Sequence, residues 1–250
     1  MLLLFIFGLL VGSFLNVIIH RLPRGESIVL PPSRCPHCGG RLSISDLVPL
    51  FSYLWLRGRC RRCGTGISLR YPLVELLTGV LFVSLYAQFG LQPLLAKHLF
   101  LASLLVAVAF IDMEHYLIPN RVVLVGLAGG VPLNLWVRDL TFLSAVLGAL
   151  VPAAFFFLLA LATRGGVGGG DIKLAAVIGL FLGWPWGLLA VFLGALAGGI
   201  LGLALLLTGR KKRKDPLPFG PFIALGAIVT VFAGEPLVCW YLSLTGLTAG

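Results

Sequence analysis

The chain has 250 residues, of which 59% are hydrophobic and only 11% are charged, and its mean hydropathy is +1.04. A soluble domain of this length does not need so much apolar surface, so the composition predicts a polytopic membrane protein. The net charge of +10 would suggest a nucleic-acid partner in a soluble protein. We expect no nucleic-acid role here, because no aromatic residues are interleaved with the basic ones and because basic residues gather in the cytoplasmic loops of membrane proteins.

Apolar segments of about 20 residues predict an all-α fold of roughly eight transmembrane helices. The expected spans cover residues 1–19, 73–89, 98–111, 122–137, 140–162, 174–182 and 187–208, with a last span after residue 222. In this arrangement both termini lie outside, and cytoplasmic segments hold 17 of the 19 Lys and Arg residues, with only Lys97 and Arg138 outside. So strong a bias supports the orientation.

Two polar residues lie within the first two expected spans, and each has two interpretations. Asn16 either packs the first span against another helix, which we favour, or lines a site. Glu75 either pairs with arginines of the preceding loop, which we favour, or faces a site.

Residues 20–72 form the sizeable polar segment of the chain, which we expect to be a small cytoplasmic domain between the first span (1–19) and a seven-helix membrane domain (73–250). It contains two Cys-x-x-Cys pairs, each followed by glycine, and 21 residues separate the pairs. The four cysteines are Cys35, Cys38, Cys60 and Cys63. This spacing is typical of a four-thiolate zinc site, which would be structural because it leaves no open ligand position. Two disulfides or redox pairs are the alternative, disfavoured because disulfides rarely persist in the cytoplasm.

A glycine-rich run, residues 165–170, precedes Asp171 between two long apolar segments. Arg164 and Lys173 flank the run, which places it at a membrane surface. Glycine allows a substrate backbone to approach closely, so we expect Gly168 and Gly170 to bind substrate. We expect Lys173, which follows Asp171, to bind substrate as well. An ionisable residue at membrane depth is a functional candidate by default.

A second aspartate, Asp112, ends the third expected span and is followed by Pro119. The out-and-back hairpin of the next two spans should bring Asp112 and Asp171 to the same membrane face. Two neighbouring carboxylates share a proton, so one can activate water while the other acts on a scissile carbonyl, which hydrolyses a peptide without a metal. The alternative is that both aspartates only cap helices.

Several motifs resemble those of one family, the bacterial type IV prepilin peptidases, which belong to the Gly-x-Gly-Asp intramembrane aspartyl proteases. The resemblance covers nearly the whole chain. The matching segments are Gly12-Ser13-Phe14-Leu15-Asn16-Val17, His20-Arg21-Leu22-Pro23, the cysteine pairs, Arg70-Tyr71-Pro72-Leu73-Val74-Glu75, Phe110-Ile111-Asp112, Leu117-Ile118-Pro119-Asn120, Gly168-Gly169-Gly170-Asp171-Ile172-Lys173-Leu174 and Pro218-Phe219-Gly220-Pro221-Phe222.

This resemblance implies Asp112 and Asp171 as the catalytic pair and the four cysteines as zinc ligands. It implies removal of a short basic leader, after a glycine, from type IV prepilins and type II secretion pseudopilins at the cytoplasmic face of the bacterial inner membrane. It further implies N-methylation of the new N-terminus with S-adenosylmethionine, because the loop of residues 20–72 is present. Prepilins, pseudopilins and membrane lipid are thus the expected partners.

Two functions of other classes compete with this one. A transporter using a proton relay would place its carboxylates near the bilayer midplane, whereas these lie near the ends of their spans. A non-catalytic assembly factor with a zinc module would tolerate replacement of either aspartate.

Overall fold

The computed structural model describes residues 1–163, 166–212 and 215–245, and within these ranges the secondary structure is helical, without a strand. The glycine-rich run therefore begins in the structure at Gly166, because Arg164 and Gly165 lie outside the described residues, as do Arg213 and Lys214 of the C-terminal basic run. The helices are α1 (Leu2–Arg21), α2 (Phe51–Trp55), α3 (Arg70–Phe89), α4 (Pro93–His115), α5 (Asn120–Val137), α6 (Phe142–Ala162), α7 (Gly169–Leu182), α8 (Trp186–Leu207) and α9 (Gly220–Thr245).

Among the described residues, seven helices are long and apolar enough to cross a membrane: α1, α3, α4, α5, α6, α8 and α9. The expected sixth span corresponds to α7, which differs from the others. It has 14 residues and so a length of about 21 Å, short of the roughly 30 Å of a bilayer core. Gly183, with φ 74°, ends α7. The multi-pass, all-helical architecture is thus confirmed, with one helix shorter than a full crossing.

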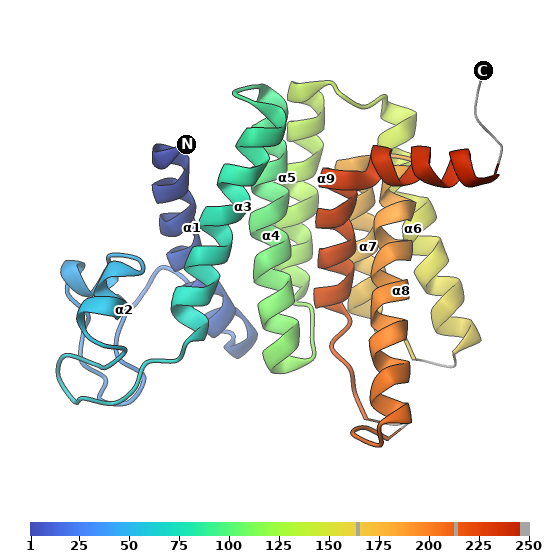
Figure 1. Ribbon diagram of the computed structural model, residues 1–250. Helices are drawn as coiled ribbons and strands as arrows, with labels where there is room; N and C mark the ends of the chain where they lie inside the picture. Colours follow the sequence, from blue (N-terminus) through green and yellow to red (C-terminus); the bar gives the residue numbers. More distant parts are fainter. Residues whose placement is uncertain (164–165, 213–214, 246–250) are drawn as a thin grey trace. The chain divides into compact units, whose positions relative to one another are not determined.

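The chain divides into two compact units, Met1–Ile111 and Asp112–Gly250. In the first unit, α1 and α3 pack closely, with the segment that carries α2 between them in sequence (Figure 1). A Cβ atom added at Gly8 or Gly12 would lie 2.7 Å from the Cα of Gly79 or Glu75, respectively. Small residues four apart allow this close helix contact, which lipid-embedded helices use in place of a hydrophobic driving force.

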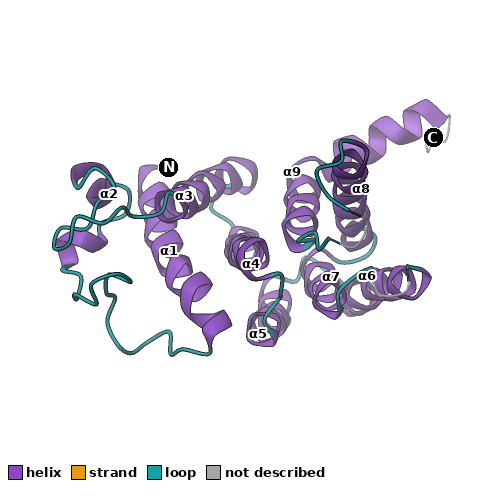
Figure 2. Cartoon of the chain, turned by 90° about the horizontal axis from the view of Figure 1, so that it is seen from below, coloured by secondary structure: helices purple, strands orange, loops and turns teal. Residues whose placement is uncertain are grey.

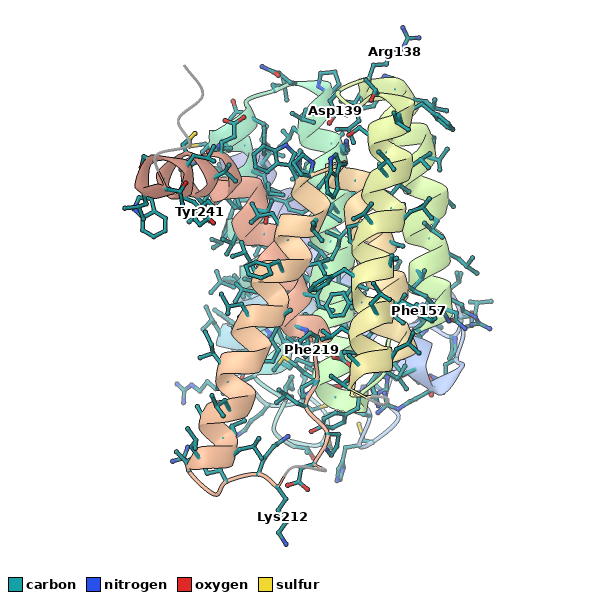
Figure 3. The ribbon with its side chains drawn as sticks, turned by 90° about the vertical axis from the view of Figure 1, so that its right-hand side faces the viewer. Arg138, Asp139, Phe157, Lys212, Phe219 and Tyr241 are labelled. Atoms are coloured by element: carbon teal, nitrogen blue, oxygen red, sulfur yellow. The ribbon has the colours of Figure 1, made fainter. Side chains whose placement is uncertain are left out.

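In the second unit, α7 is the central helix, and it contacts α5, α6, α8 and α9 (Figure 2). Eight of its 14 residues are buried, including Asp171. The carbonyl of Gly148 on α6 lies against Gly179 of α7, so these two helices meet at glycines. Charged turns mark the ends of this unit: Arg138 and Asp139 lie at one end and Lys212 at the other (Figure 3). A short, buried α7 therefore fixes the position of Asp171 within the second unit.

Candidate functional site

The four cysteines form one cluster in the loop between α1 and α3. Their Sγ atoms all lie within 4.8 Å of one another, and those of Cys35 and Cys63 are 3.9 Å apart. Zn–S bonds of 2.3 Å in a tetrahedron put sulfur atoms about 3.8 Å apart, so the cluster has the dimensions of a four-thiolate zinc site. Among the described residues, no other group of His, Cys, Asp and Glu has metal-site geometry.

Both Cys-x-x-Cys pairs fold in the same way. The amide of Cys35 donates to Gly40 O and that of Gly39 to Cys35 O, and the Cys60 pair repeats this pattern with Thr65 and Gly64. Gly39 and Gly64 adopt φ of 68° and 71°, which glycine reaches without strain. The glycine after each pair was the sequence signal for these turns, and the structure confirms it.

The electrostatics of the cluster favour a bound cation. A hydrogen bond with the Thr65 hydroxyl, with Sγ and Oγ1 3.4 Å apart, lowers the pKa of Cys63 to about 6. Backbone amides, first that of Cys38, also lower the pKa of Cys35. Thiolates rather than thiols bind metal, so these contacts prepare Cys35 and Cys63 as ligands. The backbone hydrogen bond at Gly40 lowers the pKa of Cys38, but desolvation and the neighbouring thiols of Cys35 and Cys63 outweigh it and raise this pKa to about 11.

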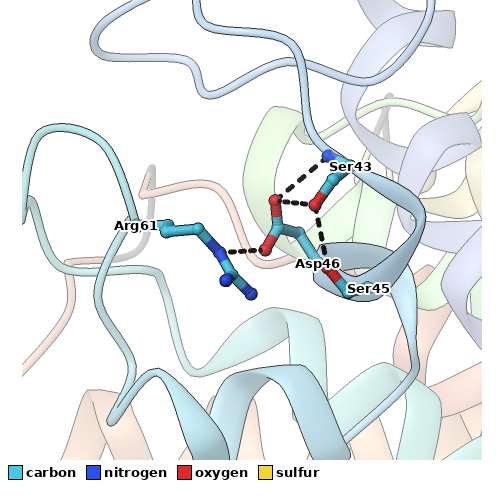
Figure 4. Close-up of polar contacts among 4 residues, drawn as sticks. All are labelled: Ser43, Ser45, Asp46 and Arg61. Carbon is cyan, nitrogen blue, oxygen red and sulfur yellow. Dashed lines mark hydrogen bonds and ion pairs between the residues drawn. The ribbon is translucent and has the colours of Figure 1, made fainter.

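Asp46 connects the two halves of this loop (Figure 4). Its Oδ2 accepts hydrogen bonds from the hydroxyl of Ser43 (2.6 Å) and the amide of Ser43 (3.0 Å), and its Oδ1 pairs with Arg61 Nε at 2.8 Å. The Ser43 hydroxyl, with help from Arg61, lowers the pKa of Asp46. The carboxylate thus joins a turn after the first cysteine pair to the second pair.

Glu75 and Asn16 hold this loop and its helices together. The buried carboxylate of Glu75 accepts a hydrogen bond from the backbone amide of Leu50 (2.9 Å), and the side chain of Ser13 also contacts it. These are partners that the sequence did not suggest, since we expected loop arginines. Asn16 is buried and donates to Tyr71 O at 3.0 Å, which confirms its interpretation as a helix-packing residue.

Asp171 lies in the first turn of α7 and is buried. Its Oδ2 accepts a hydrogen bond from the amide of Gly168 (3.0 Å), while its own amide donates to Gly168 O (3.1 Å). Gly168 is therefore the N-cap residue, and Asp171 is the third residue of the helix in a capping-box arrangement. Asp171 thus helps to cap α7 from its third position and not as the N-cap residue itself, and the bond from Gly168 occupies one of its two carboxylate oxygens.

Asp112 is buried near the end of α4, and its Oδ2 accepts a hydrogen bond from the amide of Gly220 at 2.7 Å. Gly220 begins α9, so this carboxylate lies at the N-terminus of a second helix, where the helix dipole favours negative charge. The two aspartates are close enough for the charge of Asp112 to act on Asp171. The structure therefore brings together the two carboxylates that the sequence singled out.

Two further segments surround the pair. Between α4 and α5, Ile118 lies against Gly170, where an added Cβ would stand 3.0 Å from the Ile118 Cβ. Lys173 Nζ donates to Asn120 Oδ1 at 2.8 Å. Phe219, whose backbone contacts Asp112, packs its ring edge-on against buried Phe156, with centroids 5.8 Å apart. Gly168 and Gly170 precede Asp171 and Lys173 follows it in the chain, and their contact with substrate stays a prediction.

Reasoning from the sequence missed the contacts of Gly220 and Asn120 with the site. Both belong to short motifs noted in the sequence, Leu117-Ile118-Pro119-Asn120 and Pro218-Phe219-Gly220-Pro221-Phe222, each with a proline that interrupts helix. That interruption was the available signal, because it marks where a chain can bring backbone amides and polar side chains to a buried site.

Fold and site together define a multi-pass membrane protein with two buried, interacting aspartates and a four-cysteine loop between its first two spans. Comparison with known proteins gives the same class. Residues 6–89 match the bacterial peptidase A24 N-terminal domain, and residues 99–203 match the type IV leader peptidase family. The first match contains the four cysteines, and the second contains both aspartates. The chain belongs to the type IV leader peptidase family.

Curated relatives agree over most of the chain. It is 40% identical over 247 residues to a prepilin leader peptidase/N-methyltransferase of Bacillus subtilis, covering 96% of this chain and 97% of the relative. Proteins of the same name from Aeromonas hydrophila (37% identity; 96% and 93% covered) and Burkholderia pseudomallei (38%; 96% and 87%) are also similar. No solved structure matches the chain. As a member of this family with seven candidate spans, the protein is a multi-pass protein of the bacterial inner membrane.

Proposed function

We propose that this protein removes the leader peptide from type IV prepilins and type II secretion pseudopilins, and then methylates the new N-terminus. The observation that carries the proposal is the pair of buried carboxylates, Asp112 and Asp171, each held at the start of a helix by a backbone amide. The names and lengths of the relatives support the substrate class and the second activity.

The two aspartates hydrolyse the peptide by general acid–base catalysis. Two interacting carboxylates do not both ionise readily, so the pair holds one proton between them. The ionised aspartate takes a proton from water as its oxygen attacks the scissile carbonyl carbon, while the protonated aspartate donates to the carbonyl oxygen. As the tetrahedral intermediate collapses and the C–N bond breaks, the leaving amine takes the proton that the first aspartate had removed from water, and the second aspartate regains its proton from a hydroxyl of the intermediate. In each aspartate, the backbone amide fixes one carboxylate oxygen and thereby orients the second oxygen of the same carboxylate.

The glycines beside Asp171 provide room for the substrate. Gly168 and Gly170 present backbone without side chains next to the carboxylate, so an extended peptide can approach it. Lys173 contacts the substrate at the edge of the site, with its ammonium fixed by Asn120. The cut follows a glycine, just before the apolar helix of the substrate. The excess of arginine in residues 20–72 supports an orientation with loop and active site in the cytoplasm and both termini outside.

Zinc, held by Cys35, Cys38, Cys60 and Cys63, is structural in this proposal, because four thiolates complete its coordination. S-adenosylmethionine supplies the methyl group for the new N-terminal amine. Residues 22–69, all of them described, contain two 3₁₀ turns and the short α2 but no strand, so the donor does not bind there on a Rossmann-type βαβ unit.

The test uses purified full-length protein in lipid nanodiscs with a prepilin substrate and S-adenosylmethionine. We expect Asp112→Asn and Asp171→Asn each to lower the cleavage rate on the order of 10²-fold or more, the range of general acid–base catalysis. Asp215→Asn is the matched control, because Asp215 is exposed and accepts a hydrogen bond from the amide of Lys212, three residues before it. It should cleave at the wild-type rate.

Two further readouts separate chemistry from folding. Metal content should be unchanged in both variants, and substrate supplied already cleaved should still be methylated. Cleavage near the wild-type rate by either variant, with the fold intact, would refute the aspartyl mechanism and favour the non-catalytic alternative.

A further inference from the structure

The short helix α2 carries an apolar face that nothing in the described chain covers. Phe51, Leu54 and Trp55 share one side of this helix and are 60%, 72% and 72% exposed. The rings of Phe51 and Trp55 stack, with centroids 5.9 Å apart, so the face is ordered rather than a scatter of apolar side chains. In a soluble loop, three adjacent large apolar residues at this exposure would indicate a binding surface.

The depth of this face along the membrane helices is fixed by one contact. Leu50, immediately before α2, donates its amide to Glu75, and Glu75 lies five residues after the start of α3. Five residues of helix rise about 7.5 Å, so α2 is attached beside the second turn of α3 and not beyond its end. Figures 1 and 2 agree, because both show α2 to the side of α1 and α3.

Because α3 is long and apolar enough to cross a membrane, we expect its second turn to lie at the bilayer interface. Leu73 and Leu76, which flank Glu75 on α3, are themselves 54% and 43% exposed, as expected of lipid-facing residues near the end of a span. Trp, Phe and Leu are the residues with which interfacial helices enter the boundary between headgroups and acyl chains.

The charge around α2 fits the same surface. Arg57, Arg59, Arg61 and Arg62 directly follow the helix, and residues 20–72 contain nine arginines but only two acidic residues, Glu26 and Asp46. The side chain of Arg61 lines a hollow of about 140 Å³ with Phe51 and Trp55, which places a cation beside the apolar face. Apolar residues next to arginines bind a bilayer that contains anionic lipid.

We propose that the Phe51–Leu54–Trp55 face of α2 is embedded in the interfacial layer of the membrane that α1 and α3 span. The loop of the four cysteines is then fixed at three points: the two helices at its ends, and the lipid under α2. This role is independent of the aspartate chemistry and of methyl transfer.

The test measures the depth of Trp55 in the full-length, metal-loaded protein in nanodiscs of phosphatidylcholine and phosphatidylglycerol. The chain has five tryptophans, so the emission of Trp55 is the difference between the wild type and Trp55→Phe. We expect this difference to be quenched by lipids brominated near the headgroup end of the acyl chain, and to be shielded from acrylamide in the water. The positive control is the emission of Trp136, obtained in the same way from the wild type and Trp136→Phe. Trp136 is 60% exposed near the end of the membrane-spanning helix α5, so the brominated lipids should quench it.

Quenching of the Trp55 emission by acrylamide, with no effect of the brominated lipid, would overturn the proposal. So would shielding that arises only when a prepilin peptide is added, because α2 would then be a peptide-binding surface. Leu54→Ser provides a second measurement without removing a fluorophore, and it should shift the Trp55 emission toward that of a water-exposed ring while the metal content is unchanged. An unshifted emission would count against the proposal.

Discussion

Asp112 accepts a hydrogen bond from the backbone amide of Gly220, a residue 108 positions later in the chain. The distance of 2.7 Å is that of a short, charge-assisted bond. This contact fixes one oxygen of the carboxylate at the N-terminus of α9, and so determines which way the other oxygen is turned. Gly220 thereby acts on Asp112 as a positioning residue.

Replacing Gly220 tests this relationship. A Cβ in Gly220→Ala would stand 3.0 Å from Asp112 Oδ2 and 3.1 Å from its Cβ, so the carboxylate must shift by a few tenths of an ångström. We expect cleavage to fall roughly tenfold or more, because small misplacements of catalytic groups are expensive. The cleavage rate of Gly220→Ala under single-turnover conditions in nanodiscs measures this loss. Gly199→Ala on α8, with open space around the added methyl, should cleave as wild type does. Equal activity of both variants would contradict the role of Gly220.

The glycines before Asp171 should differ in their tolerance of a methyl group. In Gly170→Ala the new Cβ would meet Ile118 at 3.0 Å, whereas in Gly169→Ala it would meet nothing within 4 Å. We expect Gly169→Ala to retain activity within about twofold and Gly170→Ala to lose roughly tenfold, because the latter separates the α4–α5 connection from α7. Cleavage rates of the two variants, measured side by side, decide the point. The reverse order would show that substrate contact, and not packing against Ile118, sets the requirement.

Lys173 and Asn120 should act as one unit. Their hydrogen bond of 2.8 Å joins the starts of α7 and α5 at the edge of the site. We expect Lys173→Met and Asn120→Ala each to reduce cleavage about two- to tenfold, which corresponds to the roughly 0.5–1.5 kcal/mol of a typical hydrogen bond, because this one is exposed to solvent. The double variant should be no worse than Lys173→Met, because Asn120 acts through the lysine. If the two losses multiply instead, Asn120 acts on the reaction by another route.

Glu75 should hold the cysteine loop against α3. Its carboxylate is buried and accepts the Leu50 amide, so Glu75→Leu leaves that amide without its acceptor. A hydrogen bond to a charged group contributes about 1.5–3 kcal/mol, so detachment of the loop should become roughly ten- to a hundredfold more frequent. Limited trypsin digestion at the loop arginines measures this detachment. Glu75→Gln retains an acceptor, so its digestion rate should lie between those of the wild type and Glu75→Leu. Identical digestion of all three proteins would rule out this role of Glu75.

Much of the site could be predicted because it is local in the sequence. The four cysteines lie in two identical turns, each built by residues within five positions of one another, so spacing alone indicated the metal cluster. Asp171 and Gly168 are also a local pair, three residues apart. The apolar segments likewise predicted the multi-pass fold, because a bilayer demands about 20 apolar residues per span and permits few alternatives.

Only the tertiary structure decided which residues far apart in the chain come into contact. Nothing in the local pattern around Gly220, Asn120 or Leu50 shows that their partners are Asp112, Lys173 and Glu75. Apolar composition also led us to count residues 174–182 as a span, whereas α7 (Gly169–Leu182) is too short for a full crossing, since a helix covered by four neighbours is as apolar as one that crosses the bilayer. The sequence determines which residues must be buried and where the chain must turn. Which distant groups then meet depends on helix packing, where close approach at glycines such as Gly148 and Gly179 sets the register between helices.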